Sequence, residues 1–193
     1  MINIAILASG SGSNAENIVS YFRNNKVAHV KLILTNNPNA GVVDRARKLN
    51  IHCEVIEKNR FKDGKSVSEL LKKENIDFLV LAGFLLLVPP SIIANFKGRI
   101  INIHPALLPN HGGKGFYGNN VHKSVIDSGA FMSGITIHHV NEKFDDGEII
   151  FQAACHVSKI ETPESLARKI HALEYAYFPV VIEKLLNQQH THS

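Results

Sequence analysis

An amide and an imidazole, Asn102 and His104, stand two residues apart where a run of branched apolar residues ends. Residues 100–103 predict a buried strand, and Pro105 ends it because proline lacks the backbone N–H that a sheet requires. Side chains alternate along a strand, so both polar groups point to one face. Ligands bind at the carboxyl ends of strands in open α/β sheets. The spacing therefore suits a catalytic or binding pair, and equally a hydrogen-bonded core Asn beside a loop His.

A second pattern suited to ligand binding follows the first apolar run. Residues 2–8 predict a strand buried on both faces, and the turn Ser9-Gly10-Ser11-Gly12-Ser13 then leads into a helix. A helix N-terminus after such a turn leaves backbone N–H groups free, so we expect a phosphate site. The turn also fits the dinucleotide pattern G-x-G-x-x-A, but Asn36 stands where the second strand should end in an acid. The absence of an acid at this position disfavours binding of a dinucleotide.

Composition and charge narrow the class of protein. The 193 residues are 45% hydrophobic and 20% charged, as in one globular domain, which we place at residues 1–187 with a disordered tail at 188–193. The net charge of +4 is mild and its cations are scattered, which disfavours nucleic acid and suits a small anionic substrate. Two cysteines without metal spacing indicate buried thiols and a cytoplasmic location. No signal peptide or membrane span is expected.

The remaining hydrophobic pattern predicts an α/β fold. Strands alternate with helices up to His104, and two alternating strands joined by a turn precede a last helix capped by Thr162. We expect a Rossmann-like open sheet, mostly parallel, with helices on both faces and a C-terminal antiparallel hairpin plus helix. Further strands are expected at 27–35, 51–56, 77–81, 133–140 and 148–156, and helices at 14–24, 41–50, 121–128 and in a segment capped by Asp63 or Ser66 that runs to 74.

Two loops of the predicted sheet could border a ligand. The apolar segment Phe84–Val88 follows the fourth strand and suits either the core, the commoner case, or the wall of a pocket for a flat aromatic ligand. The segment Asn110–Asn120, rich in glycine and asparagine, predicts a mobile loop and a potential lid.

Polar residues in the second half of the chain have ordinary structural explanations as well. Asp145-Asp146-Gly147 is typical of a hairpin turn. His138 and His139 are sequential in a strand, so only one can face the same site as His104, and the spacing supports no metal site. Periodicity alone places Glu174 on a solvated flank of the last helix.

Four motifs together resemble the folate-dependent formyltransferases, and among them the enzymes that formylate glycinamide ribonucleotide. The most specific is Asn-x-His-Pro-x-Leu-Leu-Pro with a downstream Asp. The matches span nearly the whole chain and are Ser9–Asn14, Leu81–Phe84, Asn102–Pro109, and Gly134–His138 leading to Asp145. The resemblance implies transfer of the formyl group of the co-substrate 10-formyltetrahydrofolate to the amine of 5'-phosphoribosylglycinamide in purine synthesis, without a metal.

The resemblance also implies roles for individual residues. Asn102, His104 (as imidazolium) and Asp145 would form the catalytic group, with two oxyanion donors and one proton acceptor, and His138 would support it. The ribonucleotide would contact Gly12, Ser13, Asn14, Pro105 and Glu174. The folate would contact Phe84, Leu85, Leu86, Leu87, Val88, Asn102, Asn141 and Asp145, with Lys62 or Lys65 in the place of the family's arginine.

Three alternatives compete with this function. Formyltetrahydrofolate hydrolases, and other folate-dependent formyltransferases such as those that act on methionyl-tRNA, share the Asn, His and Asp group. The hydrolases and the tRNA enzymes carry a further domain, for which we expect no room in this chain. A dinucleotide-binding protein would need the missing acid, and a non-catalytic phosphate-binding module would leave the catalytic group unexplained. We expect small-molecule partners, no nucleic acid and no membrane, and a monomer and a homodimer fit equally.

Overall fold

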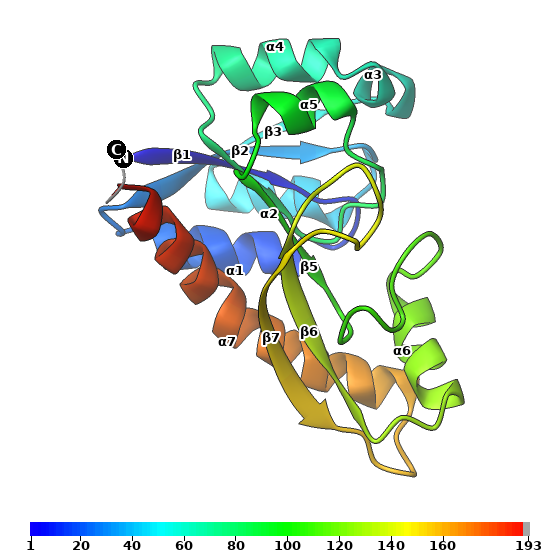
Figure 1. Cartoon of the computed structure of the whole chain (residues 1–193). Coiled ribbons are helices and arrows are strands. Elements are labelled where there is room, and N and C mark those ends of the chain that lie inside the picture. Colours follow the sequence, from blue (N-terminus) through cyan, green and yellow to red (C-terminus); the bar gives the residue numbers. More distant parts are fainter. Residues whose placement is uncertain (191–193) are drawn as a thin grey trace.

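The strands of the protein lie close to the predicted ranges. A computed structural model describes residues 1–190. Its strands are β1 (Ile2–Leu7), β2 (Ala28–Thr35), β3 (His52–Val55), β4 (Phe78–Leu81), β5 (Ile100–His104), β6 (Met132–His139) and β7 (Ile149–His156). They form one sheet in the order β3-β2-β1-β4-β5-β6-β7 (Figure 1). The pairs from β3 to β5 are parallel, whereas β6 is antiparallel to β5 and to β7.

The order of the strands locates a ligand site. The chain moves outward from β1 to β3 and then returns to β4 on the other side of β1. Loops that leave β1 and β4 therefore diverge at their carboxyl ends, and open α/β sheets bind ligands in the crevice that such a reversal creates. The mostly parallel sheet and the C-terminal hairpin that the sequence predicts are confirmed.

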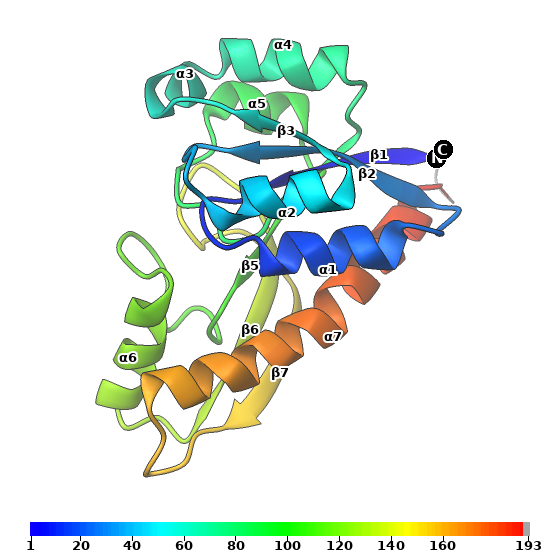
Figure 2. The same cartoon turned by 180° about the vertical axis from the view of Figure 1, so that it is seen from behind.

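Helices cover both faces of the sheet, as predicted. They are α1 (Ser13–Phe22), α2 (Gly41–Leu49), α3 (Lys58–Asp63), α4 (Lys65–Lys73), α5 (Pro90–Asn95), α6 (Asn119–Asp127) and α7 (Pro163–His190). Figures 1 and 2 show α3, α4 and α5 on one side of the sheet and α1, α2 and α7 on the other. The alternation of β1 divides the core accordingly, since Ile4 and Ile6 pack toward α1 and α7, and Ala5 and Leu7 toward the opposite layer.

The predicted start of the helix that runs to residue 74 is wrong. Neither Asp63 nor Ser66 caps it, because two helices, α3 and α4, meet at Gly64, whose φ of 72° lies in the left-handed region. A side chain there would also approach the ring of Pro89, with its Cβ 3.1 Å from Pro89 Cβ. Helices of six residues, such as α3 and α5, carry too few turns for apolar periodicity to reveal them.

The C-terminal helix is longer than expected. It begins at Pro163 with the Ser165 N–H donating to Thr162 Oγ1 at 3.2 Å, which confirms the predicted cap. It continues to His190, through the first three residues of the expected tail, because a polar sequence can extend a solvated helix end as readily as a coil. Residues 191–193 of that tail lie outside the described residues. No helix among residues 1–190 is long and apolar enough to cross a membrane.

A contact between α1 and α7 brings two distant parts of the chain together. Pro179 lies inside α7 and has no N–H for the carbonyl of Tyr175, four residues before it. That carbonyl accepts instead from Asn17 Nδ2 of α1, at 3.0 Å. The bond ties the first turns of α1 to the middle of α7, where Glu174 lies.

Candidate active site

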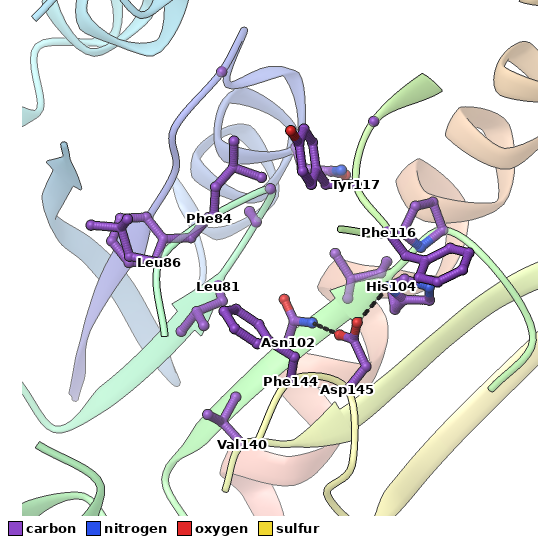
Figure 3. A pocket seen from close by; sticks show the side chains of 18 of the residues that line it. Leu81, Phe84, Leu86, Asn102, His104, Phe116, Tyr117, Val140, Phe144 and Asp145 are labelled. Atoms are coloured by element: carbon purple, nitrogen blue, oxygen red, sulfur yellow. Dashed lines mark hydrogen bonds and ion pairs between the residues drawn. The ribbon is translucent and has the colours of Figure 1, made fainter. Parts of the chain in front are cut away.

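A cavity of about 600 Å³ opens at the carboxyl ends of β1, β4 and β5. Its walls are the turn after β1, the apolar loop after β4, the loops after β5 and β6, and residues of α6 and α7 (Figure 3). All three expected catalytic residues line it, together with the expected phosphate turn and Glu174. The reversal of strand order and the observed cavity therefore coincide.

Asp145 is the centre of a polar cluster at one end of the cavity. Its Oδ1 accepts from Asn102 Nδ2 at 3.3 Å, and its Oδ2 accepts from the Gly113 N–H at 2.9 Å and lies 3.4 Å from His104 Nδ1. The turn that carries Asp145 holds it at a φ of 53°, which aspartate tolerates better than most residues. Gly147 closes this turn, because a side chain there would overlap the carbonyl oxygen of His139.

His104 lies between two acceptors. It is 3% exposed, its Nε2 lies 2.8 Å from the carbonyl oxygen of His111, and its Nδ1 faces Asp145. A carbonyl oxygen only accepts, so Nε2 carries a proton. Burial lowers the pKa of His104, although the charge of Asp145 opposes this shift. An acceptor beside each ring nitrogen favours a proton on both, whereas burial favours the neutral ring, so the imidazolium expected for the reaction stays a prediction.

The Asn102 amide is held by two partners. Antiparallel pairing places His138 opposite it, and Asn102 Nδ2 lies 3.1 Å from His138 Nε2 as well as near Asp145. His138 Nδ1 lies 2.8 Å from the carbonyl oxygen of His139, so Nδ1 carries the ring proton and Nε2 accepts. Both amide protons of Asn102 are thus engaged in this state. Figure 3 shows the amide oxygen pointing away from Asp145 into the cavity.

The cluster favours a carboxylate at residue 145. Burial by itself raises the pKa of Asp145, but the nearby ring of His138, whose Nε2 lies 3.6 Å from Oδ1, the charge of His104 and the Gly113 N–H outweigh it, so the pKa lies below its usual value. Asp145 is therefore ionised at neutral pH and can accept a proton from a substrate. As predicted, only one of the two sequential histidines faces this cluster.

The turn at the opposite end of the cavity is shaped to bind an anion. Gly12 precedes α1 with a φ of 77°, and a side chain there would place its Cβ 2.5 Å from Val42 Cβ. Only glycine allows this close approach, which turns the first N–H groups of α1 toward the cavity. Asn14 follows, and its Oδ1 is buried without a hydrogen-bond partner among the described residues.

Glu174 is buried, so the solvated flank that periodicity indicates is wrong. It is 6% exposed, accepts from Asn14 Nδ2 at 2.9 Å and lies 4.0 Å from His171 Nδ1. Burial raises the pKa of Glu174, against the effect of the Asn14 bond. Periodicity could not reveal this burial, because it comes from the contact of α1 with α7 and from the cavity rather than from the stripe of α7 itself.

The apolar loop after β4 serves both the core and the cavity. Phe84 and Val88 pack in the core, whereas Leu85 and Leu87 are 46% and 42% exposed along the cavity wall. The Leu85 N–H donates to Ser9 Oγ at 3.0 Å, and that hydroxyl donates to Asn36 Oδ1. Asn36 thus stabilises the loop at the position where a dinucleotide-binding sheet would carry its acid.

The structure does not bring every expected residue to the cavity. Pro105, Leu86 and Asn141 line it, but Lys62 of α3 and Lys65 of α4 are exposed and do not. Phe144 lies in the segment Asn141–Asp145 expected at the folate, and three lining residues belong to the loop predicted as a potential lid: Lys114, Phe116 and Tyr117. Sequence reasoning missed His122 and His171, because neither their type nor their spacing distinguishes them. The two cysteines are half-buried rather than buried, and they are not paired with each other.

A model of the formyl transferase family matches residues 2–182, so the chain belongs to that family. This confirms the resemblance that the motifs indicate. Among its relatives are phosphoribosylglycinamide formyltransferases. The chloroplastic enzyme of Arabidopsis thaliana is 41% identical over 96% of this chain and 66% of its own length, and that of Bacillus subtilis is 33% identical over 96% of this chain and 95% of its own.

The fold agrees with solved structures of the same kind. The crystal structure of phosphoribosylglycinamide formyltransferase from Bacillus Halodurans superposes with a TM-score of 0.86 at 36% identity, covering 95% of each chain. The chain spans just under two thirds of the Arabidopsis relative and nearly all of the two bacterial ones.

Proposed function

We propose that this protein transfers the formyl group of 10-formyltetrahydrofolate to the amine of 5'-phosphoribosylglycinamide, a step of de novo purine synthesis. The observation that carries the proposal is the placement of an ionised carboxylate, Asp145, beside an amide and a buried imidazole at one end of a cavity whose other end suits a phosphate. The two bacterial relatives, of which this chain covers nearly the whole length, are named for this activity.

Asp145 begins the reaction by accepting a proton from the attacking amine. The amine nitrogen forms a bond to the formyl carbon, and the electron pair of the carbonyl bond moves to its oxygen. Ionised Asp145 takes the proton that the nitrogen loses, directly or through water. The electron pair of the oxyanion then re-forms the carbonyl bond as the bond to the folate nitrogen breaks. That nitrogen takes the proton held by Asp145, directly or through water, and leaves as tetrahydrofolate.

His104 and Asn102 stabilise the oxyanion of this intermediate. The negative charge of Asp145, and then that of the oxyanion, raises the proton affinity of His104 and offsets the effect of its burial, so the ring takes its second proton from solvent and acts as an imidazolium. When Asp145 is protonated, it no longer needs the Asn102 amide as a donor. The Nδ2 group of Asn102 is then free to turn toward the oxyanion.

The two substrates lie along different walls. The folate contacts the apolar loop Phe84–Val88 and the turn from Asn141 to Asp145, and the phosphate of the ribonucleotide binds the free N–H groups of Ser13 and Asn14. Glu174 accepts hydrogen bonds from the ribose. The expected contact of Lys62 or Lys65 with the folate rests on the resemblance alone. A cytoplasmic location and a monomeric or dimeric state stay predictions.

A spectrophotometric assay of tetrahydrofolate formation tests the function. The purified protein is incubated with 10-formyltetrahydrofolate, with and without the ribonucleotide. Tetrahydrofolate that forms only when the ribonucleotide is present supports the transferase. Equal release with water alone would identify a formyltetrahydrofolate hydrolase and reject the proposal.

A further inference from the structure

His122 lines the cavity and takes no part in the mechanism above. It belongs to α6, which packs against α7, and only 4% of its surface is exposed. Its Nδ1 is buried and finds no hydrogen-bond partner among residues 1–190. Buried polar atoms are nearly always paired, so a histidine of this kind in a cavity wall requires an explanation.

The burial of one ring nitrogen assigns the ring proton. An unpaired N–H is rarer inside proteins than an unpaired acceptor, so the buried Nδ1 carries the lone pair. The proton of a neutral ring then sits on Nε2, which is the nitrogen left for the cavity. Burial, together with the charges of His171 and His104, lowers the pKa of His122 to about 4. At neutral pH the residue therefore offers one N–H donor and no charge.

His122 shares the cavity lining with His104 of the catalytic cluster and with His171, which lies beside Glu174. Its charge state is affected by His104, which belongs to the catalytic cluster, and by His171, which lies beside Glu174 near the phosphate turn. Because Ser13, Asp145 and His122 line the same cavity, a ligand that reaches from Ser13 to Asp145 lies in the space that His122 borders. The part of the ligand that lies there is the part between its phosphate and its reacting nitrogen.

The chemistry of that part identifies the atom that His122 recognises. In the proposed substrate, the phosphate has the N–H groups of α1, the ribose hydroxyls can donate to the Glu174 carboxylate, and the amine faces Asp145. The remaining strong acceptor is the amide carbonyl oxygen between ribose and amine. A neutral donor suits it, because a second cation beside His104 would be repelled when the imidazolium forms.

We propose that His122 determines substrate specificity by donating a hydrogen bond from Nε2 to the amide carbonyl oxygen of phosphoribosylglycinamide. The inference rests on the proposed function and adds a residue that recognises the glycinamide unit. His122 holds the amide, and thereby the adjoining amine, at a fixed distance from Asp145. Its effect is on binding of this one substrate rather than on the folate.

Two substitutions and a truncated ligand test the assignment by calorimetry. His122→Phe keeps a buried ring and removes the donor, and His122→Gln keeps a donor close to the position of Nε2. We expect His122→Phe to raise the Kd of the ribonucleotide about tenfold, the factor that one neutral hydrogen bond commonly supplies. His122→Gln should recover most of the affinity. Ribose 5-phosphate, which lacks the amide, should bind the wild type and His122→Phe equally.

A control and a second ligand keep the test decisive. His29 of β2 also has a buried, unpartnered Nδ1 but does not line the cavity, so His29→Phe should leave both Kd values unchanged. The thioamide analogue, whose sulfur is a weaker acceptor, should bind the wild type less tightly even if His122→Phe does not fold. Two results would overturn this inference alone. In one, His122→Phe binds the ribonucleotide with wild-type affinity; in the other, the substitution weakens the binding of ribose 5-phosphate as much as that of the ribonucleotide. Failure of the wild type to bind the ribonucleotide overturns the proposed function as well.

Discussion

Replacement of Asp145 by Asn isolates the charge at the centre of the catalytic cluster. The amide has the size of the carboxylate and keeps one oxygen, which can accept from Asn102 or from the Gly113 N–H but not from both. The amide −NH2 group then faces the other of these two donors and cannot accept from it. The substitution therefore costs one hydrogen bond and the negative charge while it leaves the turn intact.

The structure sets the size of the expected effect on turnover. Loss of a positioned general base costs a factor of about 10²–10⁴. The same substitution removes the charge that raises the pKa of His104, so formation of the imidazolium also becomes harder. With both losses in one variant, we expect kcat to fall by about 10³–10⁴, which corresponds to about 4–5.5 kcal/mol of transition-state stabilisation. The Kd of the folate should change by less than about tenfold, because the substitution keeps the size of the side chain and the hydrogen bond that it costs lies within the protein.

Steady-state kinetics and calorimetry decide between the two acids of the turn. The matched control is Asp146→Asn, because the Asp146 side chain is 51% exposed, lies 3.7 Å from Lys143 Nζ and is not itself among the residues that line the cavity. It should keep kcat within about twofold of the wild type, as surface substitutions commonly do. Wild-type turnover in Asp145→Asn together with a large loss in Asp146→Asn would refute the reasoning and move the general base by one residue.

Three further outcomes follow from the two ends of the cavity. The riboside without its phosphate should bind much more weakly than the ribonucleotide, and equal Kd values by calorimetry would remove the phosphate from Gly12–Asn14. His104→Ala and Asn102→Ala should each lower kcat by about 10²–10³ with little change in either Kd, and the double variant should lose less than the product because both act on one oxygen; a raised ribonucleotide Kd with intact kcat would contradict this. Burial raises the folded-state pKa of Glu174 above its unfolded-state pKa. The free energy of unfolding therefore decreases as the pH rises from the lower of these two pKa values to the higher. At a pH above both pKa values, Glu174→Gln should therefore unfold at a higher temperature than the wild type, where about 1 kcal/mol corresponds to about 2–4 °C. At a pH below both values, the two proteins should unfold at the same temperature. The variant should also bind the ribonucleotide less tightly.

Much of the fold could be predicted from the sequence because local pattern carries it. The apolar runs predict the seven strands, and the alternation of Asn102 and His104 with isoleucines places both side chains on one face. The cap of α7 at Thr162 is equally local, since its donor and acceptor are three residues apart. In each case the interacting groups belong to one element, whose period is known in advance.

The pairing of elements was decided only by the tertiary structure. Asp145 looks like turn chemistry in the sequence, and its contact with Asn102 exists because β6 pairs with β5 and the turn folds back over His138. Glu174 looks solvated until α1, 160 residues earlier in the chain, brings Asn14 against it. Periodicity reports which face of an element is apolar but not which distant element covers it, so burial of a polar side chain by a partner lies beyond what spacing can reveal.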